Sequence, residues 1–429
     1  MSCCTKAYNS LSKDELLSEK AKLAAEFDAH KAKGLMLNMA RGKPGDEQLA
    51  LSMPMLDILN SSANYMAEGN IDCRNYGELT GIPEAKKLFA EYMEVAPDEI
   101  IIAGSTSLTF MYDCLARAML TGVLGSERPW VKEEKVKFLC PVPGYDRHFA
   151  ICQFLGIEMI NIPTSAEGPD MDMIEKLVAA DPLIKGMWIV PKFSNPLGIT
   201  YSDQTMKRLA ALKPAAKDFR IFCDNAYAMH EVYRDVPLLN LLTACKEAGN
   251  PDMVYLFGST NKVTFPGAGI AFMAASKENI AFKTKQLSMQ AIGYDKLNML
   301  RHVRFLKDVP NIRAMMKKHA EILRPRFDAV IKKLESDLTG LGAGEWVKPD
   351  GGYFITYIAP KGCAKRIVGL CKEAGVSMTE AGATHPFGKD PDDSYIRIAP
   401  SFPSLEELGK AIEVFCTAVK LATVESLSA

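Results

Sequence analysis

Short, β-rich apolar runs recur through the middle of the chain, and helix-like segments separate several of them. The runs are "EIIIAG", "VKFLCPVPG", "GMWIVPKFSNP", "FRIFCDNAY", "MVYLFGSTNK" and "GIAFMAAS". Strands that alternate with helices predict a mainly parallel sheet covered on both faces. The first five runs end in Gly, Pro, Ser, Asn or Asp, and in such sheets the carboxyl ends of the strands form the ligand crevice. We therefore expect polar residues that are distant in sequence to meet at one edge of the sheet.

The pattern changes after about Asp308. A long apolar–polar pattern predicts a helix that is bent or broken near Pro325, and the strand candidates "GGYFITYIA" and "SYIRIAPSF" follow it. The helix-like "CAKRIVGLCKEAG" and a closing helix that begins at Ser404 complete a smaller α+β unit.

A helix that opens with a capping box at Ser12 and stops at Gly34 is expected to pack with that smaller unit. A chain of 429 residues is long enough for two domains. We predict a large domain at 48–320 and a discontinuous small domain at 1–47 and 321–429.

Composition excludes several classes of function. The net charge of −1 gives no electrostatic case for nucleic acid or an anionic membrane. No run of roughly 18 apolar residues predicts a membrane helix, and the N-terminus lacks the apolar core of a signal peptide. The eleven cysteines include no C-x-x-C pair, which favours reduced thiols over disulfides or a zinc site. We expect a cytoplasmic enzyme with no metal site.

Lys262 follows an apolar run that ends in Gly258-Ser259-Thr260-Asn261. A lysine held in a partly desolvated site has a lowered pKa and becomes a nucleophile toward carbonyls. Ser259 and Thr260 could donate hydrogen bonds to phosphate oxygens. Taken alone, the motif fits an exposed loop lysine better.

Two other strand ends carry polar groups. Asp224 ends an apolar strand and needs a cationic or hydrogen-bonding partner if it is buried, such as a protonated pyridine nitrogen. The alternative is a helix N-cap aspartate. Asn195-Pro196 forms a turn that leaves an amide side chain at the mouth of another strand, where it could donate to a phenolic oxygen.

The segment Gly104-Ser105-Thr106-Ser107 lies between a strand and an amphipathic helix. A glycine turn that opens a helix presents free N–H groups to an anion, although the segment is not a Walker loop. The alternative interpretation is simple helix capping by Ser105.

Taken in order, these motifs resemble those of one family. They are the G-S-T turn, the aromatic in "PVPGYDRH", Asn-Pro-x-Gly, Asp-x-x-Tyr and Ser-x-x-Lys. They resemble the fold-type-I pyridoxal-phosphate enzymes, specifically the class I aminotransferases, over nearly the whole chain. "NMARGKPGDEQLALS", "RNYGELTGIPE" and "SYIRIAPSFPS" look most like the bacterial aspartate aminotransferase subgroup Ic. The resemblance implies an α/β fold, with a mainly parallel seven-stranded sheet in the large domain and a smaller α+β domain.

The resemblance also implies roles for individual residues. Lys262 would hold pyridoxal 5'-phosphate as an internal aldimine and would be catalytic together with Asp224 and Tyr227. Asp224 would pair with the pyridine nitrogen, while Asn195 and Tyr227 would bond the phenolic oxygen. Tyr145 would stack on the ring.

The remaining roles concern the phosphate and the substrate. Ser105, Thr106 and Ser259 would hold the phosphate. Tyr76 would reach the phosphate of a neighbouring subunit, which implies a homodimer with shared active sites. Arg397 would clamp the substrate α-carboxylate with its two-pronged guanidinium, with Gly42 close by on the other side and Asn195 also beside the substrate.

The implied activity is ping-pong transfer of an amino group between an L-amino acid, aspartate or glutamate, and a 2-oxo acid. Another reaction on the same site, such as that of a lyase, is an alternative. Arg397 argues against decarboxylation because it would retain the carboxylate. A non-catalytic domain of a transcription regulator is the third hypothesis. Such proteins carry an N-terminal DNA-binding module, whereas only a short segment of mixed charge precedes "LNMARGKP" in this sequence.

The chain departs from the family pattern at the turn after Lys262. The sequence also does not identify which cation would bind an acidic substrate side chain. Family members carry an arginine shortly after the lysine to bind the phosphate, whereas this chain reads "FPGAGIAF" there. An acidic substrate also needs a second cation in the pocket. The candidates from the sequence are Arg41, Lys43, Arg147 and Lys192, and His148 is expected to be an ordinary hydrogen-bonded histidine.

Overall fold

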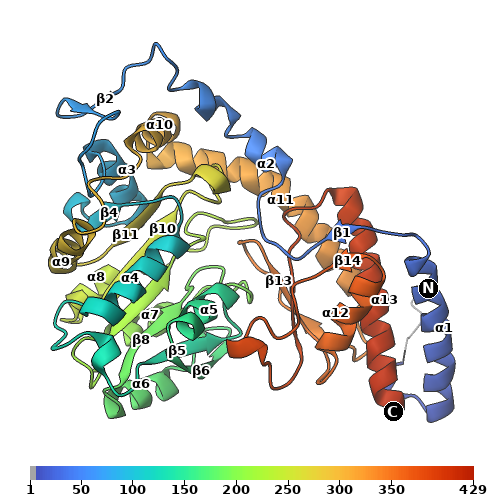
Figure 1. The fold of residues 1–429 in the computed structure, drawn as a ribbon. Coiled ribbons are helices and arrows are strands. Elements are labelled where there is room, and N and C mark those ends of the chain that lie inside the picture. The colour runs from blue at the N-terminus through green and yellow to red at the C-terminus, as the bar shows by residue number, and fades with distance from the viewer. Residues whose placement is uncertain (1–5) are drawn as a thin grey trace.

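The computed structural model describes residues 6–429 and is built around one eight-stranded sheet (Figure 1). Strands β10, β9, β8, β5 and β6 are parallel neighbours, whereas β11 lies antiparallel between β10 and β4. The predicted mainly parallel sheet is confirmed, and the two-residue β7 is added antiparallel at one edge. The strands in spatial order are β4 (Ile100–Ile102), β11 (Ala271–Ala274), β10 (Val254–Ser259), β9 (Arg220–Asp224), β8 (Ile184–Ile189), β5 (Lys137–Val142), β6 (Glu158–Ser165) and β7 (Gly168–Pro169).

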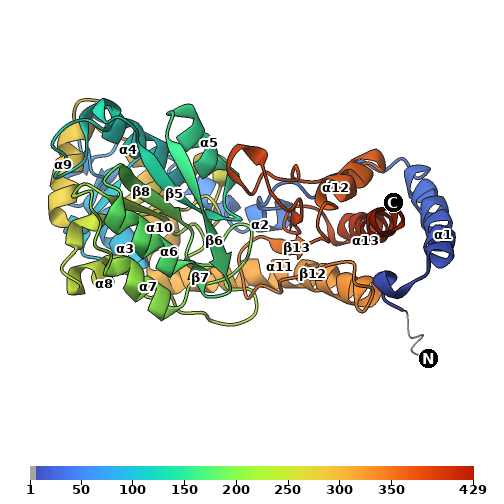
Figure 2. The same ribbon diagram turned by 90° about the horizontal axis from the view of Figure 1, so that it is seen from below.

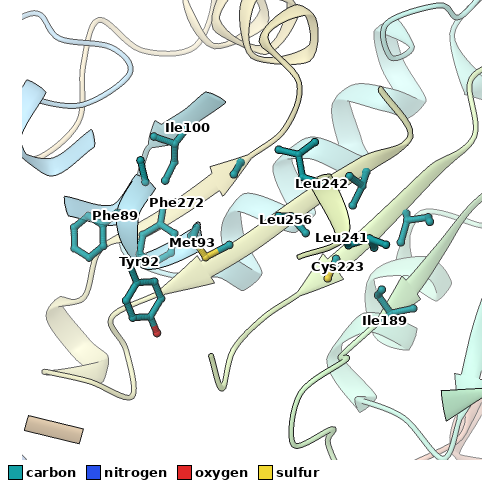
Figure 3. Close-up of a cluster of buried hydrophobic side chains, with 14 of the residues drawn as sticks. Phe89, Tyr92, Met93, Ile100, Ile189, Cys223, Leu241, Leu242, Leu256 and Phe272 are labelled. Carbon is teal, nitrogen blue, oxygen red and sulfur yellow. The ribbon is translucent and has the colours of Figure 1, made fainter. Parts of the chain in front are cut away.

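Helices cover both faces of this sheet, as the sequence predicts. Side chains alternate along a strand, so Ile221 and Cys223 enter one apolar core while Phe222, between them, enters another. Figure 3 shows part of the first core, where the rings of Phe89 and Phe272 stack 4.7 Å apart. The helices of the first core are α3 (Pro83–Met93), α6 (Met171–Ala180), α7 (Asp203–Ala210), α8 (Leu241–Glu247), α10 (Lys296–Leu306) and the start of α11 (Val309–Leu338), and those of the second are α4 (Ser107–Thr121), α5 (Asp146–Phe154) and α9 (Lys277–Leu287).

A third apolar core joins the two ends of the chain. It lies around the antiparallel sheet of β12 (Glu345–Trp346), β13 (Ile355–Ile358) and β15 (Tyr395–Ile398), with helices α12 (Ala364–Glu373) and α13 (Leu405–Ser428). The N-terminal α1 (Lys13–Lys31) lies along α13, and the expected capping box at Ser12 is present (Figures 1 and 2). The N-terminal strand β1 (Leu37–Asn38) pairs in parallel with β14 (Val376–Ser377). The N-terminal helix therefore packs with the C-terminal elements, as predicted, while the exact domain boundaries stay a prediction.

One long helix connects the large sheet to the third core. Helix α11 (Val309–Leu338) is continuous through Pro325, so of the predicted bend or break the break is wrong (Figure 2). Proline removes one intrahelical hydrogen bond, but Pro325 is exposed, where water can satisfy the carbonyl that loses its partner. Leu323 and Phe327 on either side are buried in the third core and keep the helix packed.

The remaining elements lie near the N-terminal end of the chain. They are the short helix α2 (Asp46–Ala50) and the two-stranded hairpin of β2 (Met66–Ala67) and β3 (Ile71–Asp72). Within residues 6–429, the helices are all too short or too polar to cross a bilayer.

Candidate active site

A cavity of about 730 Å³ lies at the carboxyl ends of the parallel strands. The strand-end residues that the sequence singled out meet there, which confirms the expected convergence: Asp224 ends β9 and Ser259 ends β10. Nine predicted site residues line the cavity: Gly42, Thr106, Tyr145, Asn195, Asp224, Tyr227, Ser259, Lys262 and Arg397. Ser105 and Tyr76 are not among the lining residues.

Asp224 is a buried carboxylate with one unused acceptor. Its side chain is buried, and Oδ2 lies 3.2 Å from Nε2 of His148, whose ring stacks on Trp188 at 4.4 Å. Oδ1 has no hydrogen-bond partner among the described residues. No helix begins at Asp224, so the N-cap alternative is wrong. A buried acceptor without a donor is costly, and Oδ1 therefore suits a donor that enters the cavity.

Lys262 faces the same cavity in a desolvated setting. Its Nζ lies 4.9 Å from the ring centroid of Tyr227. Burial lowers the pKa of the Lys262 ammonium below its ordinary value, although the charge of Asp224 opposes the shift. Burial also raises the pKa of the Tyr227 phenol well above its ordinary value, so that the phenol keeps its proton. The exposed-loop interpretation of Lys262 is therefore wrong.

Three histidines hold the loop that carries Lys262. Nε2 of His230 lies 3.3 Å from the Lys262 carbonyl oxygen, and Nε2 of His319 lies 3.1 Å from that of Val263. Nε2 of His302 lies 2.9 Å from Oγ1 of Thr264. Burial lowers the pKa of His302 and of His319 to about 4, so both rings are neutral near pH 7. Sequence reasoning missed these residues, because no local motif marks them.

The N-terminus of α4 forms the wall of the cavity that suits an anion. Thr106, and not Ser105, caps the helix: its Oγ1 accepts from the backbone N–H of Thr109 at 3.1 Å. Gly104 has a φ of +70°, a left-handed conformation that glycine adopts easily. The free N–H groups of the first helical turn and the helix dipole favour a negatively charged group there.

The side chain of Asn298 anchors the glycine turn after Lys262. Nδ2 of Asn298 donates to the carbonyl oxygens of Ala268 at 3.1 Å and Gly269 at 3.0 Å. Since the turn contains no arginine, no side-chain cation of the turn itself reaches the cavity. The N–H groups of α4 are therefore backbone groups that can bind an anion without an arginine in this turn.

Arg397 enters the cavity from the smaller sheet. Its Nη1 donates to Oδ1 of Asn195 at 3.0 Å and to Oδ1 of Asp146 at 3.2 Å, and Nη2 donates to Oγ1 of Thr379 at 3.2 Å. The guanidinium carbon lies 4.7 Å from the ring centroid of Phe354. Arg397 on β15 thus reaches across the cavity to residues that follow strands of the large sheet.

The four candidate cations differ in their positions. Arg41, Lys43 and Arg147 line the cavity, whereas Lys192 does not. Nζ of Lys192 donates to the Ala228 carbonyl at 2.8 Å and pairs with Glu231, so Lys192 is wrong as a candidate because its charge is already neutralised. Five cationic and two carboxylate side chains line the cavity, which makes it attractive to anions.

Tyr76 lies on a loop that does not line this cavity. Its side chain is 82% exposed. Nζ of the buried Lys296 donates to the carbonyl oxygens of Asn75 at 2.5 Å and Gly77 at 3.1 Å, on either side of Tyr76. The loop is therefore anchored, with the phenol projecting outward.

Comparison with known proteins gives consistent matches along the chain. A family model described as "Aspartate amino-transferase" matches residues 11–429. An aspartate aminotransferase from Corynebacterium glutamicum is 41% identical over 401 residues, which cover 93% of this chain and 92% of that protein. A protein from Mycolicibacterium smegmatis is 44% identical over 426 residues, covering 98% and 99%. The crystal structure of an aspartate transaminase from Corynebacterium glutamicum superposes with a TM-score of 0.95 at 39% identity, covering 98% and 99%.

Proposed function

Since the chain belongs to the aspartate amino-transferase family and is an aminotransferase of fold type I, we propose that it uses pyridoxal 5'-phosphate bound to Lys262 to move an amino group between L-aspartate or L-glutamate and a 2-oxo acid. The observation that carries this proposal is the unused buried acceptor of Asp224 in the cavity that Lys262 also faces.

The cavity fits the cofactor at three points. Oδ1 of Asp224 lacks a donor and suits a protonated pyridine nitrogen. Lys262 has the lowered pKa that attack on an aldehyde requires. The N-terminus of α4 suits the phosphate, with Thr106 and Ser259 on the cavity wall. When bound, the cofactor supplies an aldehyde for the amino group and a ring that withdraws electrons from the substrate Cα.

Individual residues of the cavity are assigned separate roles in the reaction. Once its amine is free, Lys262 is placed to remove the Cα proton as a general base. Asp224 keeps the ring nitrogen protonated. Oδ1 of Asn195 accepts from Arg397, which leaves the Asn195 amide N–H to donate to the phenolic oxygen beside the Tyr227 phenol. Tyr145, buried enough to raise its pKa to about 12, is assigned to the ring face.

A dicarboxylic substrate is supported by the charge of the cavity. Arg397 is assigned to the α-carboxylate. Arg41, Lys43 and Arg147 leave positive charge on the same walls for the distal carboxylate. The Corynebacterium relative named aspartate aminotransferase points to the same substrate class.

We also propose a homodimer in which Tyr76 serves the partner's cofactor site. The phenol is exposed and its loop is anchored. Met289 and Ile292 are 83% and 66% exposed beside Gly293, which packs against Gly77. This apolar surface next to Tyr76 suits a subunit interface. A cytoplasmic location is proposed because all nine cysteines within residues 6–429 are free thiols.

The proposed function is tested by steady-state kinetics with L-aspartate and 2-oxoglutarate. The expected result is formation of oxaloacetate and glutamate with parallel double-reciprocal lines. Such lines indicate a ping-pong mechanism, in which the enzyme retains the amino group after the first product leaves and before the second substrate binds. Intersecting lines, or no product with either acidic amino acid, would contradict the proposal.

Gly42→Ala is expected to lower kcat/KM for L-aspartate by roughly 10- to 100-fold, since small displacements of a positioning group are costly. A Cβ at Gly42 would lie 2.5 Å from Cζ of Phe354, and the ring that supports Arg397 would have to move. Gly369→Ala is the matched control because its Cβ would meet no atom within 4 Å. Equal kinetics of the two variants would show that Phe354 does not position Arg397.

The pH at which Lys262 reacts tests its lowered pKa. A depressed pKa leaves more neutral amine at a given pH, so reductive trapping of pyridoxal phosphate on Lys262 should reach its midpoint below the ordinary lysine value. Lys277 is an internal control, because its hydrogen bond to Asp98 raises its pKa. Peptide mass spectrometry across a pH series measures both sites at once. Trapping at Lys262 that begins no earlier than at Lys277 would contradict the assignment.

A further inference from the structure

The guanidinium of Arg397 is already largely engaged in the structure. A guanidinium has five N–H groups. Both hydrogens of Nη1 are used, one by Asn195 and one by Asp146, and one hydrogen of Nη2 is used by Thr379. Nε is buried and has no acceptor among the described residues. The carboxylate of a substrate would therefore have to bind Arg397 while Arg397 is already paired with the Asp146 carboxylate.

A bidentate carboxylate needs two adjacent N–H groups, either on Nη1 and Nη2 or on Nε and Nη2. Nη1 of Arg397 contacts Asp146 and Asn195, which both line the cavity, whereas Nε is buried, so the first pair is the one that an incoming carboxylate reaches. The first pair requires one acceptor of Nη1 to leave. Asn195 is only 6% exposed, whereas the Asp146 side chain is 35% exposed and lines the cavity. Asp146 is the acceptor that can move.

We propose that Asp146 is an exchangeable carboxylate, which occupies the place of the substrate α-carboxylate on Arg397 and is displaced when substrate binds. The proposal rests on the role of Arg397 in the proposed function. Asp146 is the first residue of α5, a helix of nine residues, so the helix dipole still favours its charge after displacement. The pair joins α5 to β15, and exchange replaces one link across the cavity with another made by the substrate.

Such an exchange makes Asp146 a determinant of how tightly the site binds carboxylates. A ligand with a single carboxylate gains little binding free energy, because its carboxylate only takes the place of the Asp146 carboxylate on Arg397. A dicarboxylate gains the additional attraction of the other cations on the cavity walls, Arg41, Lys43 and Arg147. The cost of displacing Asp146 is common to both kinds of ligand, so the advantage of the dianion comes from these other cations, while the monoanion is left with little net gain.

The test is the binding of succinate and acetate, measured by calorimetry on protein supplied with pyridoxal phosphate. Asp146→Asn removes the competing charge but keeps a polar residue at the start of α5. Succinate should bind about fivefold more tightly to this variant, as expected for loss of a partly exposed ion pair. Acetate should gain at least as much, so the preference for succinate should not grow. In turnover, KM for L-aspartate should fall by a similar factor while kcat changes less than about twofold.

Two further variants make the result decisive. Thr379→Val removes an acceptor that stays in place, and should weaken succinate binding. Asp98→Asn changes a surface ion pair with Lys277 and should leave binding unchanged. Weaker or unchanged succinate binding by Asp146→Asn, or no succinate binding by either protein, would overturn the proposal. Binding needs no turnover, so a protein that lacks aminotransferase activity but binds succinate more tightly after Asp146→Asn would refute the proposed function alone.

Discussion

Lys262→Ala is expected to lower aminotransferase turnover by at least about 10⁴-fold, since loss of a general base alone costs up to that factor. The variant loses both the amine that binds the cofactor and the base at the substrate Cα. Asp224 and Tyr227 face the same cavity but cannot replace it, because Asp224 is assigned to the ring and Tyr227 keeps its proton. The measurement is turnover with L-aspartate and 2-oxoglutarate, together with the absorbance of lysine-bound cofactor, which should disappear.

The control for this variant is a lysine of similar chemistry outside the site. Lys277 is exposed and paired with Asp98, so Lys277→Ala should keep full activity. Lys262→Ala should remain folded, because it removes an ammonium whose burial is unfavourable. Substantial activity in a folded Lys262→Ala protein would remove Lys262 from the catalytic centre.

Asp224→Ala is expected to lower kcat on the order of 10³-fold. Removing one partner of a buried ion pair costs about 3–5 kcal/mol, and here the pair is the one that Asp224 would form with the cofactor ring. The effect should fall mainly on kcat, because the protonated ring is needed most when charge develops on the substrate Cα. Steady-state kinetics at saturating cofactor separate this effect from weaker cofactor binding.

His148→Gln is the comparison that isolates the carboxylate. It removes the ring that lies 3.2 Å from Oδ2 of Asp224 but leaves the acid itself. Its loss of kcat should be much smaller, about tenfold, because the variant removes one close polar neighbour of the carboxylate and keeps the carboxylate itself. Equal losses in the two variants would indicate that the carboxylate acts only through His148.

The fold follows from periodic patterns that a single sequence displays. Apolar runs that alternate with helices predicted the parallel sheet, and polar residues at the run ends predicted where Asp224 and Ser259 would meet. Both patterns report local physics: strand burial and the shared edge of parallel strands. The resemblance to fold-type-I aminotransferases, carried by the order of five motifs, is confirmed by the family match and the structural neighbours.

Contacts between distant segments were beyond such reasoning. Lys192 was a reasonable candidate cation until the structure paired it with Glu231, 39 residues away. His319 reaches the Lys262 loop over 56 residues, and Asp146 reaches Arg397 over 251. A side chain's partner across the fold depends on tertiary packing, which no local spacing records. The predicted break at Pro325 was wrong for the same reason, because burial of its neighbours in α11 outweighs the loss of one hydrogen bond.

The most direct test of the central claim is the absorbance of the purified protein with pyridoxal phosphate, before and after L-aspartate is added without any oxo acid. The account predicts that the band of lysine-bound cofactor converts to that of pyridoxamine phosphate while oxaloacetate appears in equal amount. A band that ignores aspartate but responds to another amino acid would contradict the substrate assignment. Absence of any lysine-bound band would contradict the role of Lys262 itself.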